Sequence, residues 1–195
     1  MRSLLYILIT AVFAHTAFAE DEYFPLAVGQ EITMTATVVS ASGKTSEGVA
    51  HQKIEGTVEK DGKTYYRDLV SIDTPALKGE FAKLLRKDEK AAYSIDDGKE
   101  GAVEQIEALF PLKVGATWQH KADTKTMTTT VIGLESIEIS GKSYEKCWHL
   151  HTTSSDGSYT EDAWEAPALG DVKSEVVFGN GAKIILTLKE FKPGK

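Results

Sequence analysis

The sequence has a single cysteine, Cys147, so the chain cannot form an internal disulfide bond and must rely on an ordinary hydrophobic core. This is feasible, because a domain of about 150 residues buries roughly 70% of the surface that its unfolded chain exposes. No apolar run downstream of residues 1–19 approaches the roughly 20 residues needed to cross a bilayer. No cysteine directly follows the N-terminal apolar run, so a lipid anchor is not expected there. These absences favour a soluble domain without a transmembrane segment.

Positive charge is also scarce. The chain has 22 lysine and arginine residues against 29 aspartate and glutamate residues, for a formal net charge of −7 at pH 7. No basic run with interleaved aromatic residues interrupts this acidic composition. An acidic surface repels phosphate backbones and anionic membranes, and its usual effect is solubility. Nucleic acid is therefore not a predicted partner.

Motifs for acyl transfer and for nucleotide chemistry are missing as well. The chain has no G-x-S-x-G elbow and no P-loop. Gly179-Asn180-Gly181 begins like a dinucleotide fingerprint, but Ile184 stands where the third glycine is needed, and the context is that of a hairpin. The sequence thus predicts no cofactor and no catalytic residue, and we expect a protein that is not an enzyme.

The N-terminus has the pattern of a secretory signal peptide. Arg2 supplies the basic start, residues 4–13 are almost unbroken apolar sequence, and Ala17-Phe18-Ala19 forms an A-x-A cleavage site. We therefore expect residues 1–19 to be removed by cleavage between Ala19 and Glu20. The mature protein is predicted to be exported, either to the periplasm or out of the cell.

One hexapeptide occurs twice. FPLAVG at residues 24–29 returns as FPLKVG at residues 110–115, and each copy precedes a strand-like run. SGKSY at 140–144 likewise echoes DGKTY at 61–65. We expect two similar β repeats, 20–108 and 109–195, that form one compact domain. Because proline holds the chain extended and glycine permits the turn into a strand, we interpret the hexapeptide as a structural corner.

The dominant period of the chain is two. Ile32, Met34, Ala36 and Val38 alternate with threonines, which predicts a half-buried strand. Turn signals such as Asp61-Gly62 separate the further strands that we expect. These strands cover residues 48–59, 64–72, 91–95, 117–122, 125–139, 143–153, 159–166, 172–178 and 182–191. The pattern predicts an all-β fold, an antiparallel meander that is curled into a barrel or half-barrel.

Two segments are harder to assign. Within residues 75–87, Phe81, Leu84 and Leu85 have helical spacing, but 81–87 can also be a strand that pairs with 91–95. We favour the strand, because strands are expected on both sides of it. The acidic segment 96–107 is interpreted as the connection between the repeats, which form either one barrel or two abutting lobes.

Several turn and packing segments suggest relatives. They are the leader, FPLxVG before a strand with Trp118, GKSYEKC at 141–147, EAPALGDVKSEV at 165–176 and LTLKEF at 186–191. Together they resemble a group of poorly characterised exported bacterial β-proteins that includes the TapB-like proteins. The resemblance implies an envelope location and a curved sheet like that of the LolA and LolB lipoprotein carriers, whose concave face holds an apolar ligand. The chain lacks the anchoring cysteine of LolB and has no LolA-specific residue, so lipoprotein transport is not carried over.

Histidines provide the first candidate site. His149 and His151 share one face of an expected strand with Cys147, and two histidines at this spacing can chelate one metal ion. Cys147 and His151 would lie roughly 13 Å apart at about 3.3 Å per residue, so other ligands are needed. His120, His51 and Glu161 are the candidates for that role. The glutamate that follows the HxH pattern of cupins is missing here, and packed or surface histidines are the alternative interpretation.

Carboxylates and tryptophans provide two more candidate sites. Glu161 and Glu165 would lie about 13 Å apart on one strand, beyond the roughly 5 to 9.5 Å of glycosidase pairs. With Asp162 they are therefore interpreted as a solvated acidic face. Trp118, Trp148 and Trp164 could stack on sugars, although core packing is the more common use of tryptophan.

Three functions remain open from the sequence. The first is a non-enzymatic exported binding or structural protein that holds a lipid-like or other apolar molecule, or another envelope protein, with its concave sheet. The second is a metal-binding protein or metalloenzyme that uses His149 and His151. The third is a carbohydrate- or protein-binding module that uses exposed tryptophans.

Overall fold

A computed structural model describes residues 23–122 and 124–195, so the expected leader and its cleavage site lie outside the described residues. Twelve strands follow one another in this part of the chain. They are β1 (Glu31–Val39), β2 (Thr45–Lys60), β3 (Lys63–Asp73), β4 (Lys78–Lys87), β5 (Ala91–Asp96), β6 (Gln105–Leu109), β7 (Thr117–Ala122), β8 (Lys125–Ile139), β9 (Lys142–Ser154), β10 (Tyr159–Ala166), β11 (Gly170–Phe178) and β12 (Lys183–Lys192). Among these residues, no helix has the length and apolar character needed to cross a membrane.

The predicted alternation produces these strands. In β1, Ile32, Met34 and Ala36 are buried, whereas Thr35 between them is exposed. Successive side chains of a strand point to opposite faces, so one face of β1 packs inward and the other meets solvent. The ambiguous segment around Phe81 is a strand, as the neighbouring strands suggested, and it pairs with both β3 and β5.

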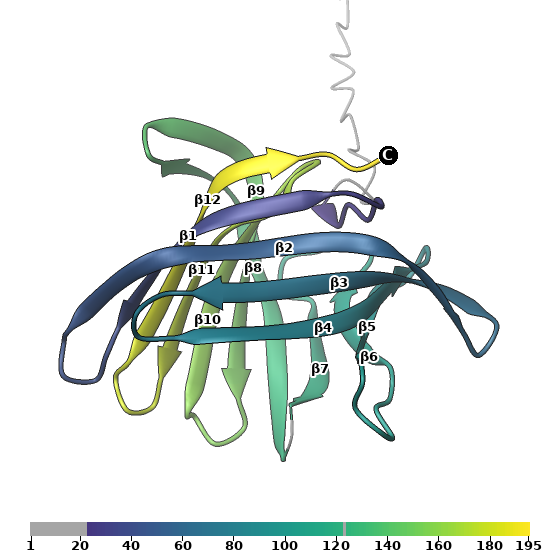
Figure 1. The fold of residues 1–195 in the computed structure, drawn as a ribbon, viewed down its shortest axis with the longest axis horizontal. Coiled ribbons are helices and arrows are strands. Elements are labelled where there is room, and N and C mark those ends of the chain that lie inside the picture. The colour runs from purple at the N-terminus through teal and green to yellow at the C-terminus, as the bar shows by residue number, and fades with distance from the viewer. Residues whose placement is uncertain (1–22, 123) are drawn as a thin grey trace, which may run out of the picture.

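All twelve strands belong to one antiparallel sheet in the order β6-β5-β4-β3-β2-β1-β12-β11-β10-β9-β8-β7. Each strand therefore pairs with its neighbours in sequence, except where β1 meets β12 and where the sheet ends at β6 and β7. Figure 1 shows β2, β3 and β4 crossing the front of the molecule, with β8 to β11 running steeply behind them. The sheet thus curls into a nearly closed barrel, which confirms the predicted fold class.

Side chains close the remaining gap between β6 and β7. The backbone amide of Lys121 in β7 donates a hydrogen bond to Oε1 of Gln105 in β6, at 2.9 Å. Trp118 of β7 is buried in the same apolar cluster as Ala108 of β6. No backbone ladder joins the two strands within the described residues. These contacts cover two edges that would otherwise be open to pairing with another chain.

The two copies of the hexapeptide lie directly before β1 and β7. Gly29 and Gly115 have φ angles of 83° and 81°, a left-handed conformation that favours glycine. The Gly29 amide donates to the carbonyl of Ile54 in β2, and the Gly115 amide donates to that of Val131 in β8, both at 2.8 Å. Each copy of the hexapeptide therefore forms a corner. Its glycine is hydrogen-bonded to the second strand after it, which is β2 for the first copy and β8 for the second.

Two large clusters of buried apolar side chains stabilise the barrel. The first includes Met34, Ala36, Cys147, Val172 and Leu188, from β1, β9, β11 and β12. The second includes Tyr23, Leu112, Trp118, Val131 and Leu150, around the gap between β6 and β7. Members of both clusters, including Met34 and Leu150, also line a cavity inside the barrel.

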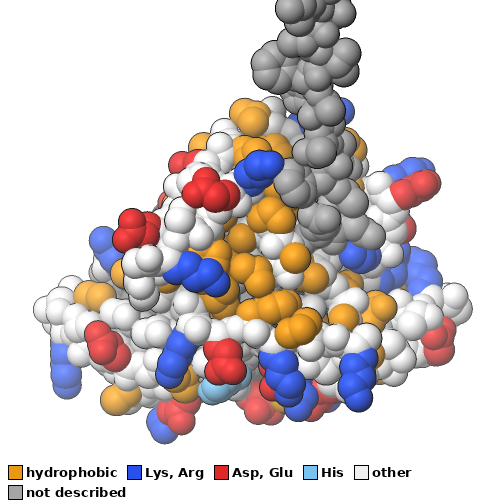
Figure 2. All heavy atoms as spheres, turned by 90° about the horizontal axis from the view of Figure 1, so that it is seen from above, with side chains coloured by type: hydrophobic (Ala, Val, Ile, Leu, Met, Phe, Trp, Pro, Cys, Tyr) orange, Lys and Arg blue, Asp and Glu red, His pale blue; other side chains and the backbone are white. Residues whose placement is uncertain are grey.

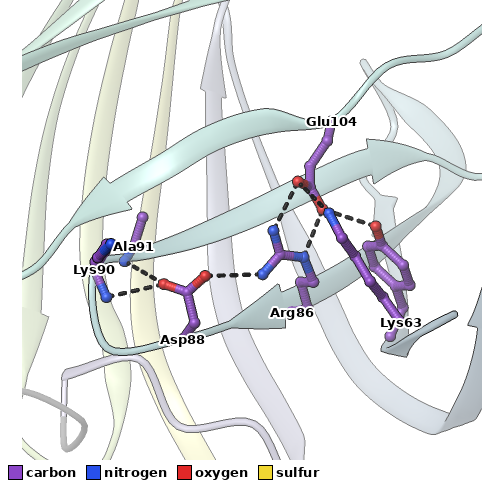
Figure 3. Close-up of polar contacts among 7 residues, drawn as sticks. Lys63, Arg86, Asp88, Lys90, Ala91 and Glu104 are labelled. Carbon is purple, nitrogen blue, oxygen red and sulfur yellow. Dashed lines mark hydrogen bonds and ion pairs between the residues drawn. The ribbon is translucent and has the colours of Figure 1, made fainter. Parts of the chain in front are cut away.

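The acidic segment 96–107 is more than a connection, and here the sequence interpretation was incomplete. Its last residues begin β6, which completes one edge of the sheet. Before that strand, Glu104 accepts hydrogen bonds from Nε and Nη2 of Arg86, at 2.6 and 2.7 Å, and from the hydroxyl of Tyr65, at 2.7 Å. Lys63 and Asp88 extend this network on either side, as Figure 3 shows. The network fixes the segment to β3 and β4.

Candidate functional site

A cavity of about 460 Å³ lies inside the barrel. Its lining comes from both walls of the sheet, from β1 to β4 on one side and from β8 to β12 on the other, with one residue each from the edge strands β6 and β7. Ligand pockets in proteins usually measure roughly 300 to 1,000 Å³. The cavity is therefore large enough for a small organic molecule.

Apolar side chains form much of the cavity wall. Those that line it include Met34, Val70, Leu85, Leu150 and Leu186, each on a different strand. Phe24 of the first hexapeptide reaches the same space, so the corner before β1 also forms part of the site. An apolar part of a ligand could lie against these residues without losing a hydrogen bond.

The cavity is nevertheless acidic. Five carboxylates line it: Asp68 on β3, Glu107 on β6, Glu161 and Glu165 on β10, and Asp171 on β11. Lys83 on β4 is the one lysine or arginine of the described residues that lines the same cavity. The interior therefore combines an apolar wall with an excess of negative groups.

Two of the five carboxylates are well paired. Glu107 accepts from Nζ of Lys83 at 3.1 Å, and Glu161 accepts from Tyr159 and Ser174, both at 2.7 Å. Desolvation raises the pKa of Glu107, but Lys83 and a hydrogen bond from Ser94 outweigh it, so that the pKa is lowered. Desolvation also lowers the pKa of Lys83, and the charge of Glu107 reverses this effect. The Lys83–Glu107 pair thus remains ionised inside the barrel.

Asp68 is only half satisfied. Its Oδ2 accepts a hydrogen bond from Nε2 of Gln52 at 2.9 Å, whereas its Oδ1 is buried and finds no partner among the described residues. The side chain is 3% exposed. Desolvation raises the pKa of Asp68 to about 6, although Gln52 and Lys83 act in the opposite direction.

Glu165 and Asp171 form the third feature of the cavity. They are direct cross-strand partners in β10 and β11, an arrangement that is unfavourable for two like charges. Glu165 is 9% exposed, and the exposed surface of Asp171 borders the cavity. Desolvation raises the pKa of both groups, and the charge of Asp171 raises that of Glu165 further. Only desolvation and neighbouring charges act on the pKa values of these two carboxylates, and no hydrogen bond from a described residue does.

The expectation of a solvated acidic face is therefore wrong for two of its three members. Glu161 and Glu165 alternate with Asp162 along β10, and it is the pair at 161 and 165 that faces inward. Only Asp162 lies on the outer face. The physical reason is that a barrel interior with a cavity can hold carboxylates, whereas the sequence pattern assumed a fully packed interior.

The structure brings together only two of the four histidine candidates within the described residues. His149 and His151 lie on the outer face of β9, where their ring nitrogens are 2.8 and 2.9 Å from the same oxygen of Asp162. His120 lines the cavity instead, and desolvation lowers its pKa. His51 also lines the cavity and bonds to Thr33 at 3.2 Å. No group of three or more possible ligands has the arrangement of a metal site in residues 23–122 and 124–195.

Cys147 is not available as a ligand. It is completely buried in the first apolar cluster, and its thiol donates to the carbonyl of Tyr144 at 3.4 Å. Burial raises the pKa of the thiol to about 11. A thiol in this state is a packed apolar group and neither a nucleophile nor a metal ligand at neutral pH.

The three tryptophans lie in three different environments. Trp118 is buried, and Trp148 is half-buried and makes an edge contact with Tyr23. Trp164 stacks on His149 with ring centroids 4.7 Å apart, and Nζ of Lys173 lies 4.6 Å from its ring centre. The three rings do not form one platform on which a sugar could stack.

Hydrophobic side chains are not confined to the interior. Figure 2 shows them gathered in the middle of the face that is seen from above, with charged side chains around them. Val103 and Val114, for example, are 66% and 67% exposed. Because apolar residues also lie on the surface, apolar character in the sequence is not sufficient to identify the residues that line the cavity.

Sequence reasoning missed Asp68, Lys83, Glu107 and Asp171. One signal was available for Asp68 and Lys83, because each lies at an inward position of a strand whose alternate residues are apolar, such as Val70 and Leu85. A charged residue at such a position indicates either a strand edge or a polar interior. No comparable signal marks Asp171, which lies next to a β-bulge.

Solved structures share this fold. A protein from Bacteroides fragilis that is assigned as exported and has a YmcC-like fold aligns with a TM-score of 0.50 and 12% identity, over 87% of this chain and 98% of that chain. A protein from Parabacteroides distasonis that is assigned as a lipoprotein aligns at a TM-score of 0.48 and 14% identity, over 87% and 98% of the two chains. A β-barrel-like protein from Brucella abortus aligns at 0.47 and 8%, over 87% and 99%. Neither a family model nor a curated protein sequence matches the chain.

At these identities, the likeness concerns the fold alone. The resemblance to TapB-like and LolA or LolB proteins stays a prediction.

Proposed function

We propose that this chain is an exported, non-enzymatic protein that binds a small molecule with a substantial apolar part inside its barrel. The observation that carries the proposal is the cavity of about 460 Å³, which is walled by apolar side chains from opposite sides of the sheet. A lipid-like chain or a small ring system would remove this wall from water, and burial of apolar surface contributes about 25 cal/mol per Å².

Two observations support export. The leader pattern of residues 1–19 predicts secretion, and the structural neighbours are assigned as an exported protein and a lipoprotein. Envelope compartments contain lipids, lipid precursors and many amphipathic metabolites, which are ligands of the required size.

The state of the reactive groups supports binding without chemistry. The single thiol is buried with a raised pKa, and the histidines on β9 share a carboxylate on the outer face rather than activating a nucleophile. Glu107 and Glu161 are held by partners in the resting protein. The cavity therefore offers contacts for a ligand more readily than a reaction site.

A neutral apolar fluorophore, N-phenyl-1-naphthylamine, tests the proposal. Its emission rises when it enters an apolar site, so titration into the purified mature protein reports binding to the cavity. Ala163 lines the cavity and Thr35 is exposed on the outer face of β1. Ala163→Leu and Ala163→Phe fill the cavity by two different volumes, and Thr35→Phe adds an aromatic ring outside it.

Saturable binding by the wild type and by Thr35→Phe, with a loss of roughly tenfold or more in the Ala163 variants, is the expected result. The larger side chain should cause the larger loss, provided that the variant unfolds with the cooperativity of the wild type. Equal binding by all four proteins would show that the probe binds elsewhere and would overturn the proposal.

A further inference from the structure

The cavity contains a carboxylate oxygen that has no partner. Asp68 lines the cavity, and its Oδ1 is buried and accepts no hydrogen bond from any described residue. A buried acceptor without a donor costs about 1 to 3 kcal/mol, and more when it is charged. Such an atom in a cavity wall indicates a missing donor, which a ligand can supply.

The protein has a cation nearby, but that cation is committed elsewhere. Lys83 is the direct cross-strand neighbour of Asp68, yet its Nζ lies 3.1 Å from Glu107 on β6. Lys83 influences Asp68 only through its charge, without a hydrogen bond. Oδ1 of Asp68 therefore lacks a partner even though a lysine lies on the neighbouring strand.

Two further carboxylates face the same space without partners. Glu165 and Asp171 come from the opposite wall, and Asp68 is among the charges that act on Asp171. The negative charges of Asp68 and Asp171, and those of Asp171 and Glu165, repel each other, and desolvation disfavours the ionised forms of the two buried residues, Asp68 and Glu165. A positively charged group placed among them would remove both penalties at once.

A bare metal ion does not fit this arrangement, since the described residues contain no cluster with the geometry of a metal site. A protonated amine has three N–H donors and no acceptor. It therefore needs hydrogen-bond acceptors around it, but these need not have the regular geometry of metal ligands. The apolar wall formed by Met34, Leu150 and Leu186, among others, continues from this acidic part of the cavity.

We propose that the ligand of this cavity is an organic cation, with a protonated amine bound by Asp68, Glu165 and Asp171 and with an apolar chain or ring against the apolar wall. This inference rests on the proposed function and names its ligand class. It excludes fatty acids and other anionic amphiphiles as the preferred ligands.

Three probes of equal chain length and different head-group charge test the inference: octylammonium, 1-octanol and octanoate. Their affinities for the mature protein are measured by calorimetry at pH 7 and at concentrations below micelle formation. The wild type should bind octylammonium roughly tenfold or more tightly than octanoate, because a hydrogen bond to a charged group is worth at least that factor. Octanol should lie between them.

Asp68→Asn and Glu165→Gln keep the shape of each side chain and remove one negative charge from the cavity. Both should lower the affinity for octylammonium towards that for octanol and leave octanol binding unchanged. Glu190→Gln removes one negative charge from an exposed position on β12 and should behave like the wild type. If either cavity variant does not fold, the other still decides the question.

Equal affinity for all three probes, or an octylammonium preference that survives both cavity substitutions, would overturn the cation inference while leaving the binding function intact. Failure of all three probes to bind would contradict the proposed function as well.

Discussion

Two sets of carboxylates in this barrel are treated in opposite ways. Glu104, at the end of the sheet near β3 to β6, receives donors from Arg86, Tyr65 and Lys63 (Figure 3). Inside the cavity, Asp68 has one donor, and no hydrogen bond from a described residue acts on Glu165 or Asp171. The fold supplies several partners to the carboxylate that fixes the chain, whereas three of the five carboxylates that line the cavity are left partly or wholly without them.

The pKa directions express the same contrast. The hydrogen bonds from Arg86 lower the pKa of Glu104 to about 2, whereas desolvation raises the pKa of Asp68 to about 6. The first group stabilises the folded state in its ionised form, and the second destabilises it in that form. Groups of the second kind are frequent in binding and catalytic sites, where a ligand or a proton completes them.

Removal of the Glu104 charge should have the largest effect. Glu104→Gln leaves Arg86, whose side chain is 14% exposed, with only Asp88 as an ionic partner. We expect the free energy of unfolding to fall by about 2 kcal/mol, as measured by urea denaturation at pH 7. Lys53→Gln, which breaks an exposed pair with Glu31, is the control and should change stability little. Equal losses of stability in the two variants would show that the partners of Glu104 contribute no more than an exposed ion pair.

Neutralisation of a cavity carboxylate should instead raise the free energy of unfolding. A group whose pKa is raised in the folded state contributes stability that is present below its unfolded pKa and is lost as the pH rises through the folded value. Glu165→Gln should therefore be more stable than the wild type at pH 8, by about 1 kcal/mol, and this advantage should disappear near pH 4. The charged groups that face this pair are Asp68, Lys83, Glu107 and Glu161.

The measurement is the difference in unfolding free energy between Glu165→Gln and the wild type from pH 4 to pH 8. A difference that does not change with pH would mean that Glu165 is ionised as easily in the barrel as in the unfolded chain. The pH dependence of Glu104→Gln should be different, because this variant is expected to be less stable than the wild type. The pKa of Glu104 is lowered in the wild type, so the stability loss should be present above about pH 4.3 and shrink as the pH falls towards 2.

The outer histidine cluster should have the smallest effect. His149 and His151 share Asp162 at a partly exposed position, where ion pairs are usually worth little. The double variant His149→Gln, His151→Gln should lose no more than about 1 kcal/mol of stability. Its metal content, measured by elemental analysis of purified protein, should equal that of the wild type. A bound metal that is present only in the wild type would restore the metal-site alternative.

Local patterns were sufficient to predict most of the fold. The alternation in β1 and the Asp61-Gly62 turn depend on neighbouring residues only, and the structure has a strand and a turn at these places. β6 was missed because its five residues, Gln105–Leu109, include two charged or amide side chains and follow an acidic segment. The division into two repeats stays a prediction.

The site could not be read in the same way. Asp68 and Lys83 are neighbours across β3 and β4, which register alone predicts, but Asp171 and Glu165 become partners only through a bulge between Trp164 and Glu165. The cavity itself depends on how far the sheet curls before β6 meets β7, and no local pattern encodes that distance. The histidine pair was found from spacing, yet its partner Asp162 lies on the next strand.

The most direct test of a binding function is the mass of the protein isolated with its own leader from the exported fraction, compared under native and denaturing conditions. We predict an excess of about one small-molecule ligand in the native spectrum, which disappears on denaturation and is absent from Ala163→Phe. The released molecule should carry an amine. Equal native and denatured masses for the wild type, together with no binding of N-phenyl-1-naphthylamine, would contradict the account.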